Sequence, residues 1–407
     1  MIRLNHHTTL ICITILLCLF AGCRFSNPQG NAPAIPTATA TATPAPTDAP
    51  SKTPTPTTTP TPTCTPTPTL TPTPTPVITT LVISCAGDVT LGSDVVNQNA
   101  SMNFFKTYDK VQDDSYFFAN VYPYFAADDL TLVNLEGVLS DRGTRKDKTF
   151  AFRGDPSYVN ILLEGSVESV CLANNHSFDY GNTSHEDTRT ILTEAGIGYS
   201  YDSIVDYTTI KDIKVALISI YTIRNGLEGS KNLLEQTIAE AEAEGAKLII
   251  TSFHWGTEKT DKITSLQETL GHYAIDLGAD LVVGHHPHVL QPVEKYNNRY
   301  IAYSLANFCF GGNTNPKDKD TMILRQTFTF VDGILQPDNS IEVIPCSVSS
   351  VTNRNNYQPT PQIGEEADRI IRKLNHYSYP YDVYFVKTTE GIYVPATLLP
   401  AIAPDYP

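Results

Sequence analysis

The chain has 407 residues, of which 41% are hydrophobic, and this is enough apolar material for a sizeable core in one large or two ordinary domains. Its formal net charge at pH 7 is −15, and the sequence has no cluster of basic residues of the kind that nucleic-acid binding requires. We therefore expect no nucleic-acid partner. A negative envelope also discourages the attraction of polyanions, except through a local cation.

Residues 1–23 predict a targeting segment. Its apolar stretch from Leu10 to Ala21 is too short for a comfortable membrane span but is typical of a signal-peptide core. The segment ends at Cys23 in a pattern that resembles a lipobox, where bacterial lipoproteins are cleaved and acylated, although Phe20 stands where that pattern prefers leucine. We expect Cys23 to carry lipid and to hold the chain on the extracellular face of the bacterial cell membrane. An ordinary secretory signal or an uncleaved anchor is the alternative.

Residues 24–77 predict a disordered, Thr/Pro-rich spacer. From Asn31 to Pro76 the chain is dominated by Thr, Pro and Ala, a composition that cannot bury apolar surface and favours extended conformations. At ~3 Å per residue, about 45 residues could hold a domain up to roughly 140 Å from an anchor. We expect the folded domain to cover residues 78–396 and a loose C-terminal tail to cover residues 397–407.

In the folded domain, short apolar runs alternate with longer amphipathic ones, which is typical of an α/β fold. The predicted strands cover residues 81–85, 130–134, 167–172, 215–220, 248–253, 281–283 and 300–305. Two further strands, residues 322–331 and 340–348, predict antiparallel hairpins with a turn at Asp332-Gly333.

The predicted helices lie between these strands and after them. They cover residues 156–163, 185–194, 231–244, 266–276 and 364–375. Gly196, Gly245 and Gly278 follow the second, third and fourth of these helices, where a glycine C-cap is expected. We expect the last helix to pack on the outside of the domain.

Polar residues follow five of the predicted strands at the points where the strands end. In chain order they are Asp88, Asn134 with Glu136, Asn174 to Asp179, His254 to Glu258, and the stretch from His285 to His288. Each has an ordinary explanation as a turn residue, a helix cap or a core residue. Because ligands gather at the carboxyl ends of strands in α/β sheets, the whole set predicts a metal or catalytic site at one rim.

The stretch from Gly284 to His288 is the most informative of these strand ends. It places three histidines within four positions, and imidazole is the commonest protein ligand for transition metals. The pair His286 and His288 flanks Pro287, so an extended backbone would turn both rings to the same side. A histidine-rich surface loop, or histidines satisfied within the core, is the alternative interpretation.

Residues 81 to about 350 resemble the CapA family of bacterial capsule-synthesis (poly-γ-glutamate) proteins. The matching stretches are Gly87–Gly92, Asn134–Gly137, Ala173–His176, Asp179–Gly181, His254–Gly256, Gly284–His288 and Tyr303–Phe308. That family is similar in turn to the calcineurin-like metallophosphoesterases. The resemblance implies a four-layer α/β/β/α sandwich with a dinuclear metal centre at the strand ends.

The resemblance also implies roles for particular residues. The implied metal ligands are Asp88, Glu136, Asn175, His254, His286 and His288. His176 stands at the position of the proton donor, and His285 matches no ligand position, so we expect it to support the ligands. The cofactor would be one or two divalent metal ions, Mn, Fe or Zn.

Two departures from the metallophosphoesterase pattern affect this expectation. Thr90 stands where those enzymes have a metal-binding histidine, and Glu136 replaces their bridging aspartate. Losing an imidazole weakens one metal site, so a mononuclear centre or altered chemistry is a possible outcome. Arg153 is a candidate clamp for a carboxylate or phosphate of the substrate, and a surface arginine without such a role is an equal alternative.

The combined expectation is a surface lipoprotein of the capsule-synthesis type with a metal-dependent, hydrolase-like site. Its expected partners are an anionic cell-envelope polymer such as polyglutamate, the membrane through its lipid, and a capsule synthase complex. Two alternatives stay open. One is a non-catalytic accessory protein that tethers or exports the polymer with a vestigial metal site, and the other is a general surface metallophosphoesterase.

Overall fold

The computed structural model describes residues 75–97, 100–337 and 340–397. The predicted targeting segment with Cys23, the predicted spacer up to residue 74 and the predicted tail from residue 398 lie outside the described residues. Among the helices of the described part, none is both long enough and apolar enough to span a membrane.

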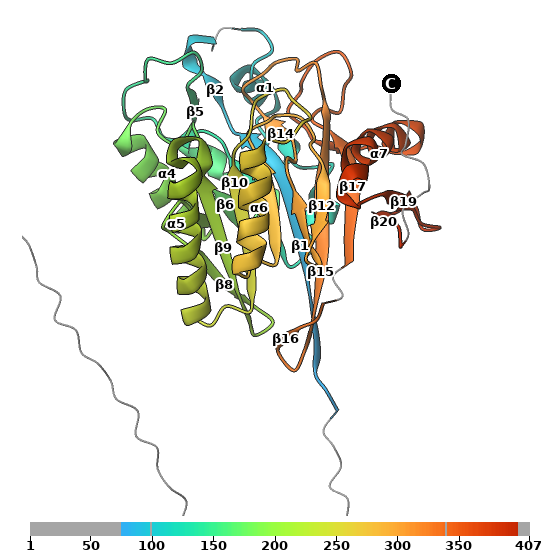
Figure 1. Ribbon diagram of the computed structural model, residues 1–407. Coiled ribbons are helices and arrows are strands. Elements are labelled where there is room, and N and C mark those ends of the chain that lie inside the picture. Colours follow the sequence, from blue (N-terminus) through green and yellow to red (C-terminus); the bar gives the residue numbers. More distant parts are fainter. Residues whose placement is uncertain (1–74, 98–99, 338–339, 398–407) are drawn as a thin grey trace, which may run out of the picture. The chain divides into compact units, whose positions relative to one another are not determined.

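Two β-sheets pack face to face and form the centre of the domain (Figure 1). The main path of the first sheet runs in the order β19 (Phe385–Lys387), β20 (Tyr393–Pro395), β17 (Ser340–Ser347), β15 (Asp320–Val331), β1 (Ile78–Thr90), β3 (Leu130–Leu135), β6 (Ser169–Cys171) and β7 (Gly198–Ser200). Three more strands pair at its margins, namely β14 (Asn307–Phe310) with β1, β16 (Ile334–Leu335) with β15, and β18 (Thr360–Pro361) with β17. The second sheet has the order β12 (Val293–Tyr296), β13 (Arg299–Ala302), β11 (Leu281–His285), β10 (Leu248–His254), β9 (Ile213–Tyr221) and β8 (Asp206–Ile210).

Helices cover the outer face of each sheet. The helices beside the first sheet are α1 (Phe104–Val111), η2 (Asp114–Phe117), α2 (Tyr122–Phe125), η3 (Pro156–Tyr158), α3 (Val159–Glu164) and α4 (Asn182–Ala195). The short η1 (Val95–Asn97) instead packs through Val95 on the cluster of Val138, Ala151 and Tyr180. The second sheet is covered by α5 (Thr222–Ala243) and α6 (Ser265–Leu277). A small third sheet of β2 (Ser93–Asp94), β5 (Phe152–Gly154) and β4 (Val138–Leu139) adjoins the end of β1. The predicted four-layer α/β/β/α sandwich is therefore confirmed.

The side chains between the two sheets form one continuous apolar core. Leu81 and Ile83 of β1 lie in the same buried cluster as Leu217 of β9, Ile250 of β10 and Val283 of β11. The alternation of β1, with one face toward this core and the other toward the helices, follows from the period of two along a strand. The rim where the strands end is consequently held by packing on both sides.

The last helix, α7 (Gly364–Ser378), which continues into η4 (Tyr379–Tyr381), closes one edge of this core. It lies outside the two sheets, as expected (Figure 1), but its buried face belongs to the inter-sheet cluster through Ile370 and Leu374. Ser378 Oγ accepts a hydrogen bond from the backbone N–H of Val293 in β12 at 2.9 Å. The helix thus completes the sandwich at the side where β12 and β17 would leave it open.

Several local predictions are confirmed. Gly196, Gly245 and Gly278 adopt positive φ at the ends of α4, α5 and α6. The strands β15 and β16 are joined at Asp332 and Gly333, which both have positive φ, as a two-residue hairpin turn requires. Strands β11 and β13 pair in parallel, as the closeness of the two predicted strands suggested.

One predicted strand is shorter in the structure than the pattern indicates. The pattern predicts a strand over residues 300–305, but β13 ends at Ala302 and β14 begins at Asn307. Between them Ala306 has a φ of +66°, and the chain leaves the second sheet to join the first, where Asn307 lies opposite Asp88. An apolar run gives no signal of this crossing, because the residues on both sides of it are equally buried.

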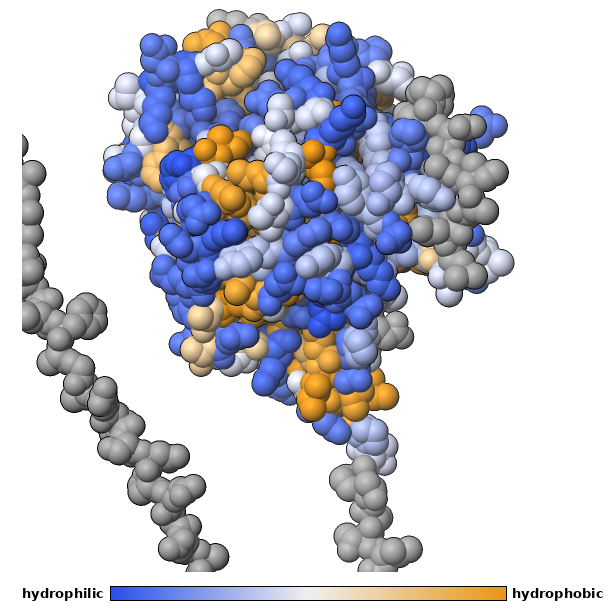
Figure 2. All heavy atoms as spheres, in the orientation of Figure 1, coloured by the Kyte–Doolittle hydropathy of each residue, from blue (hydrophilic) through white to orange (hydrophobic). Residues whose placement is uncertain are grey.

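An exposed apolar tip lies at the end of the sandwich opposite the carboxyl end of β1. It consists of Val77, Ile78 and Ile334, each about two-thirds exposed, and Figure 2 shows the apolar surface gathered there. The backbone C=O of Val77 accepts a hydrogen bond from Asp332 N–H at 2.8 Å, which fixes the start of β1 beside the β15–β16 turn.

Three chain segments approach so closely at Gly284 that there is no room for a side chain at this position. A methyl group added at Gly284 would lie 2.0 Å from the Tyr303 carbonyl oxygen and 2.4 Å from Trp255 Nε1, which donates to that same oxygen at 2.8 Å. We expect Gly284→Ala to lower the free energy of unfolding by roughly 1–3 kcal/mol or more, because backbone atoms must move to admit the methyl group. Chemical denaturation measures this loss.

Gly229→Ala in α5 is the matched control. The nearest atom to its added methyl group is Asn225 Cβ at 3.3 Å, on the other side of the kink that Gly226 makes in α5. We expect the stability of this variant to stay within about 1 kcal/mol of the parent, because only one side-chain contact is tight and alanine favours a helix over glycine. Equal losses in both variants would contradict the close approach at Gly284.

Candidate metal centre

The fold brings the predicted ligands from both sheets to a single rim. Asp88 lies near the end of β1, Glu136 follows β3, Asn175 and His176 follow β6, His254 ends β10, and His286 and His288 follow β11. The crossing of the chain from β13 to β14 passes the same rim, because the backbone N–H of Asp88 donates to the carbonyl of Ala306 at 2.9 Å. Residues that are far apart in the sequence therefore meet where the strands end.

Asp88 is the central carboxylate of this rim. It is 0% exposed, and its Oδ2 lies 3.0 Å from His288 Nδ1. His285 Nδ1 lies 3.3 Å from Asp88 Oδ1, although neither ring nitrogen of His285 makes a hydrogen bond. Burial opposes ionisation of Asp88, but these two histidines outweigh it and hold the pKa of Asp88 well below its usual value. Asp88 is thus a charged ligand candidate in contact with the histidine stretch.

A chain of amides joins the two sheets through Asp88. Asn174 Nδ2 donates to Asn134 Oδ1 at 3.0 Å, and Asn134 Nδ2 donates to Asp88 Oδ1 at 2.8 Å and lies 3.5 Å from His254 Nδ1. On the other side of the ring, His254 Nε2 lies 2.8 Å from Asn175 Oδ1. Asn134 and Asn174 were not singled out as site residues by the sequence, although both stand in the matching motifs. Their amides orient Asp88 and His254.

Glu136 is the least satisfied group of the rim. It is 0% exposed, and neither carboxylate oxygen has a hydrogen-bond partner. Two histidine nitrogens lie close to its Oε1, His176 Nε2 at 3.7 Å and His254 Nε2 at 3.9 Å. Burial, together with the charge of Asp88, raises the pKa of Glu136 well above its usual value.

The donor atoms fit a divalent cation. One oxygen each of Asp88 and Glu136 and one ring nitrogen of His288 lie within 4.8 Å of one another. Two carboxylates with neutral imidazoles are donors that first-row divalent metals accept. A buried carboxylate without hydrogen bonds is destabilising unless a cation satisfies it. The burial of Glu136 without any hydrogen bond is therefore the observation that favours a bound cation here.

The histidine turn after β11 is held in an unusual backbone conformation. His286 has a φ of +94° and His288 a φ of +59°, values that residues with a Cβ rarely adopt and that cluster at functional sites. The rings of His254 and His286 lie with their centroids 4.7 Å apart. Burial lowers the pKa of His286 to about 4, and burial with the charge of His286 lowers that of His254 well below its usual value. Both rings are neutral at physiological pH, as metal ligation requires.

His288 differs from these two rings in its protonation. Burial lowers its pKa, but the carboxylates of Glu136 and Asp88 outweigh that effect and raise the pKa of His288 to about 9. Without a cation, a proton on this imidazole therefore supplies the positive charge that balances Asp88.

His176 is oriented by a charged pair from outside the ligand set. Its Nδ1 lies 2.6 Å from Asp179 Oδ2, and Lys148 Nζ donates to Asp179 Oδ1 at 2.7 Å and to the carbonyl of Asn175 at 3.0 Å. The Phe152 ring stacks on the imidazole with centroids 4.2 Å apart. Burial lowers the pKa of His176. Its Nε2 consequently faces Glu136, while its Nδ1 is fixed by Asp179.

Thr90 and Arg153 occupy defined positions near the centre. Thr90 Oγ1 donates to the backbone carbonyl of Glu136 at 2.8 Å, so the residue that replaces the expected histidine holds the Glu136 segment in place. The guanidinium of Arg153 lies 3.8 Å from the centroid of the Tyr180 ring and donates to the carbonyl of Arg142. The role of Arg153 as a substrate clamp stays a prediction.

A carboxylate that the sequence did not single out as a ligand adjoins the histidine turn. Glu258, in the loop after β10, offers an oxygen that lies within 4.8 Å of ring nitrogens of His286 and His288. In the sequence, Glu258 could be noticed only as part of the polar stretch from His254 to Glu258 that follows β10. No family motif drew attention to it.

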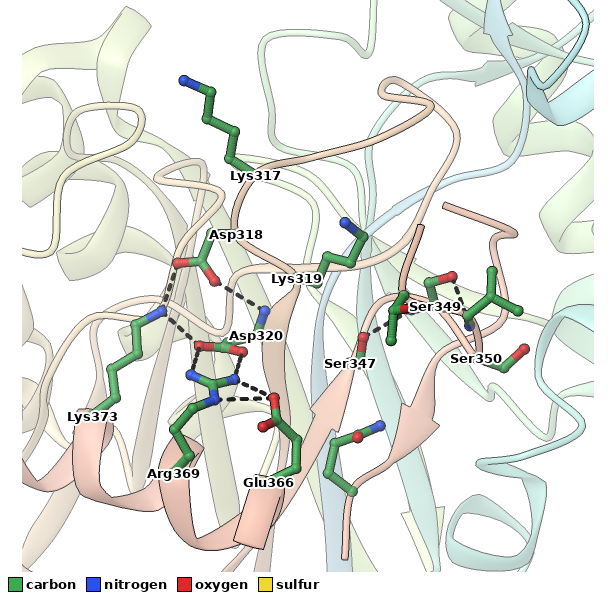
Figure 3. A pocket seen from close by; sticks show the side chains of 13 residues that line it. Lys317, Asp318, Lys319, Asp320, Ser347, Ser349, Ser350, Glu366, Arg369 and Lys373 are labelled. Carbon is green, nitrogen blue, oxygen red and sulfur yellow. Dashed lines mark hydrogen bonds and ion pairs between the residues drawn. The ribbon is translucent and has the colours of Figure 1, made fainter. Parts of the chain in front are cut away.

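A separate cavity of about 590 Å³ lies between β15, β17 and α7 (Figure 3). Two of its four cations, Arg369 and Lys373, are paired with carboxylates, whereas Lys319 Nζ donates to Asn315 Oδ1 and to the carbonyl of Pro316. The guanidinium of Arg369 pairs with Asp320 and Glu366, and Lys373 Nζ pairs with Asp318 at 2.6 Å and Asp320 at 2.8 Å. None of the predicted ligands lines this cavity, so the metal centre is the candidate functional site.

Comparison with known proteins identifies a family and several similar chains. Residues 82–312 match the family described as bacterial capsule synthesis protein PGA_cap. The capsule biosynthesis protein CapA of Bacillus anthracis is 29% identical over 332 residues, which are 73% of this chain and 78% of that protein. The PGA biosynthesis protein CapA of Bacillus subtilis is 30% identical over 223 residues, 49% of this chain and 58% of that protein. Among solved structures, the sulfate thiohydrolase SoxB of Thermus thermophilus aligns with a TM-score of 0.36 and 11% identity, over 75% of this chain and 61% of that chain.

Replacing Glu136 by glutamine should separate stability from metal binding. In the presence of a chelator, we expect Glu136→Gln to raise the free energy of unfolding at pH 7 by roughly 1–3 kcal/mol, because a buried carboxylate without partners is removed. The parent should gain about 3 kcal/mol from a metal ion at a hundred times its dissociation constant, and the variant should gain much less. Chemical denaturation with and without Mn²⁺ measures both effects. A variant that is less stable without metal and equally stabilised by Mn²⁺ would contradict this assignment.

The pKa of His288 predicts how the stability of the metal-free protein depends on pH. Below pH 6.5 both the folded and the unfolded states hold the proton, so the pair with Asp88 contributes fully. As pH rises from 6.5 through about 9, only the folded state keeps the proton, and this contribution is lost. We expect a loss of roughly 1–3 kcal/mol over this range, measured by denaturation in chelator, and a smaller loss in His288→Asn. The same slope in both proteins would show that another group is responsible.

Proposed function

The chain belongs to the bacterial capsule synthesis protein family PGA_cap, and from this premise we propose that it acts on an anionic capsule polymer of the poly-γ-glutamate class through a metal-dependent hydrolase or transferase site. The buried, partnerless carboxylate of Glu136 carries the metal-dependent part of the proposal, because nothing else in the described part of the chain satisfies it. Relatives whose names refer to capsule and PGA biosynthesis support the polymer.

Two roles are proposed for the residues of the centre, metal ligation and proton transfer. Asp88, Glu136, Asn175, His254, His286 and His288 would hold one or two divalent cations. A cation bound there would supply Lewis acidity toward an acyl or phosphoryl oxygen and lower the pKa of water. It would also supply a local positive charge, which a protein with a net charge of −15 needs in order to attract a polyanion.

His176 is the group suited to move a proton. Asp179 fixes Nδ1, so Nε2 is the nitrogen that faces the centre and can deliver a proton to a leaving group. Burial lowers the pKa of His176, so Nε2 would first accept a proton, for example from the attacking water, and then pass it to the leaving group. The Lys148–Asp179 pair keeps the ring in this orientation during the transfer.

The proposed location is the extracellular face of the cell membrane. The lipobox-like ending at Cys23 and the Thr/Pro-rich composition of residues 24–77 support a lipid anchor with a long spacer. Such an anchor would place the domain among newly exported polymer chains and beside a capsule synthase complex.

One observation favours a competing, non-catalytic function. Thr90 uses its hydroxyl to hold the Glu136 segment and offers no imidazole, so one half of a dinuclear site has a weaker donor set than a metallophosphoesterase has. A protein of this kind would bind the polymer through its cation and assist export or tethering without cleaving it.

The deciding experiment measures metal content and polymer cleavage in the full chain and in Asp88→Asn. Ligand-supporting residues already contribute about 10–100-fold to metal affinity, so loss of a ligand should weaken metal binding by about 100-fold or more. We expect the parent to contain metal and to shorten poly-γ-glutamate, and Asp88→Asn to do neither. Elemental analysis and the size distribution of the polymer are the readouts.

Asp212→Asn is the matched control, since Asp212 is exposed in the turn between β8 and β9. A metal-free parent, or an Asp88→Asn variant that supports polymer display as well as the parent does, would refute the enzyme and favour the accessory role. Cleavage of a model phosphodiester without cleavage of polyglutamate would identify a general surface phosphoesterase instead.

A further inference from the structure

We propose that Glu258 is a metal ligand and that, with His286 and His288, it forms an outer cation-binding half of the centre. This inference rests on the proposed metal-dependent function and adds a donor that the family resemblance does not supply. The inner half would consist of Asp88, Glu136 and the residues joined to them.

The geometry defines two groups of donors that share one histidine. The donor atoms of Glu258, His286 and His288 lie within 4.8 Å of one another, and so do those of Asp88, Glu136 and His288. Donors around one metal ion at ~2.0–2.2 Å from it lie about 3–4 Å apart, so small side-chain rotations would close the outer group on an ion. His288 turns Nδ1 toward Asp88 and therefore lies at the boundary between the halves.

The backbone holds Glu258 against the histidine turn. On one side of it, Trp255 N–H donates to the carbonyl of His285 at 3.2 Å, and on the other side Lys259 N–H donates to the carbonyl of Pro287 at 2.8 Å. Two hydrogen bonds thus connect the loop of Glu258 to the turn that carries His286 and His288. A lone surface carboxylate would not need this double attachment.

Gln291 fixes the continuation of the same loop. Its Nε2 donates to the carbonyl of Thr260 at 3.0 Å and to that of Lys262 at 3.2 Å. Gln291 is itself fully buried and accepts a hydrogen bond from Gln267 at 2.8 Å. The loop that carries Glu258 is therefore anchored to the core, which preorganises the donor for a ligand.

A second observation within the group points to a missing ligand. His286 is 8% exposed, and its Nδ1 has no hydrogen-bond partner. The Glu258 side chain is 48% exposed, and its ion-pair partner among the described residues is Lys259 at 3.8 Å, a separation that contributes little. A cation would satisfy both groups. One carboxylate and two imidazoles form a donor set that catalytic zinc sites use with a position left open.

The proposal also accounts for Thr90. The outer group supplies a carboxylate to a centre in which the expected histidine is absent, and it does so from the second sheet, whereas Thr90 lies on the first. The centre can therefore hold two cations without an imidazole at position 90.

Manganese titration of the full chain tests the role of Glu258. We expect the parent to bind two equivalents of Mn²⁺ after dialysis, with the magnetic coupling of neighbouring ions in its electron paramagnetic resonance spectrum. Glu258→Gln should keep one equivalent with an uncoupled spectrum, or bind the second about 100-fold more weakly. Glu164→Gln, at an exposed position at the end of α3, should behave as the parent does.

The outcomes separate this inference from the proposed function. If Glu258→Gln keeps two coupled equivalents at the parent's affinity, or if the parent binds a single equivalent that the variant retains, the role of Glu258 is refuted while a metal-dependent function stands. If the parent binds no Mn²⁺, Zn²⁺ or Fe²⁺, the proposed function fails as well. Because Glu258 lies on an exposed loop position, circular dichroism should show the variant folded in every case.

Discussion

The burial of two carboxylates at one rim is the constraint on which the rest of this structure depends. Asp88 and Glu136 both lie where the two sheets meet, and both are inaccessible to solvent. Burying a charge is strongly destabilising unless opposite charge or hydrogen bonds compensate. For Asp88 the fold supplies an amide and two histidines, whereas the histidines nearest Glu136 lie at 3.7 and 3.9 Å and make no hydrogen bond to it. The rim is therefore built to be completed by positive charge from outside the chain.

Protons take the place of that positive charge when no cation is bound. The pKa of His288 is raised to about 9, so this imidazole holds a proton near neutrality, while Asp88, whose pKa is lowered, stays ionised. Burial and the charge of Asp88 also raise the pKa of Glu136. A divalent cation would displace the proton of His288, so its apparent affinity rises with pH. The same competition links the stability of the domain to its metal content. Stability and function are thus opposed at Glu136, where the group that destabilises the metal-free fold is the one that favours the cation.

The pattern of strands and helices predicted an α/β fold and the rim, and the family resemblance implied the four layers, but neither predicted the contacts within the rim. Strand ends are visible because apolar runs stop at polar residues, and this signal alone brought Asp88, Glu136, His254 and the histidine turn together. It could not reveal Glu258, whose proximity to His288 depends on backbone bonds between two loops. Nor were the short helices within residues 104–125 predicted, although Phe104, Tyr108 and Val111 of α1 stand at helical spacing and Asn103 caps the helix. The proposed anchor and spacer lie outside the described residues.

Strand β1 runs the length of the domain and separates its two ends. This strand starts beside the apolar tip at Ile78 and reaches Asp88 at the opposite end, a span on the order of 30–35 Å at ~3.3 Å per residue. The proposed metal centre therefore lies at the end of the domain opposite the point where residues 75–77 lead into β1. Under the proposed anchoring, a polymer would reach this centre from the side remote from that attachment, so polymer length and not closeness to the lipid surface would decide what it can reach.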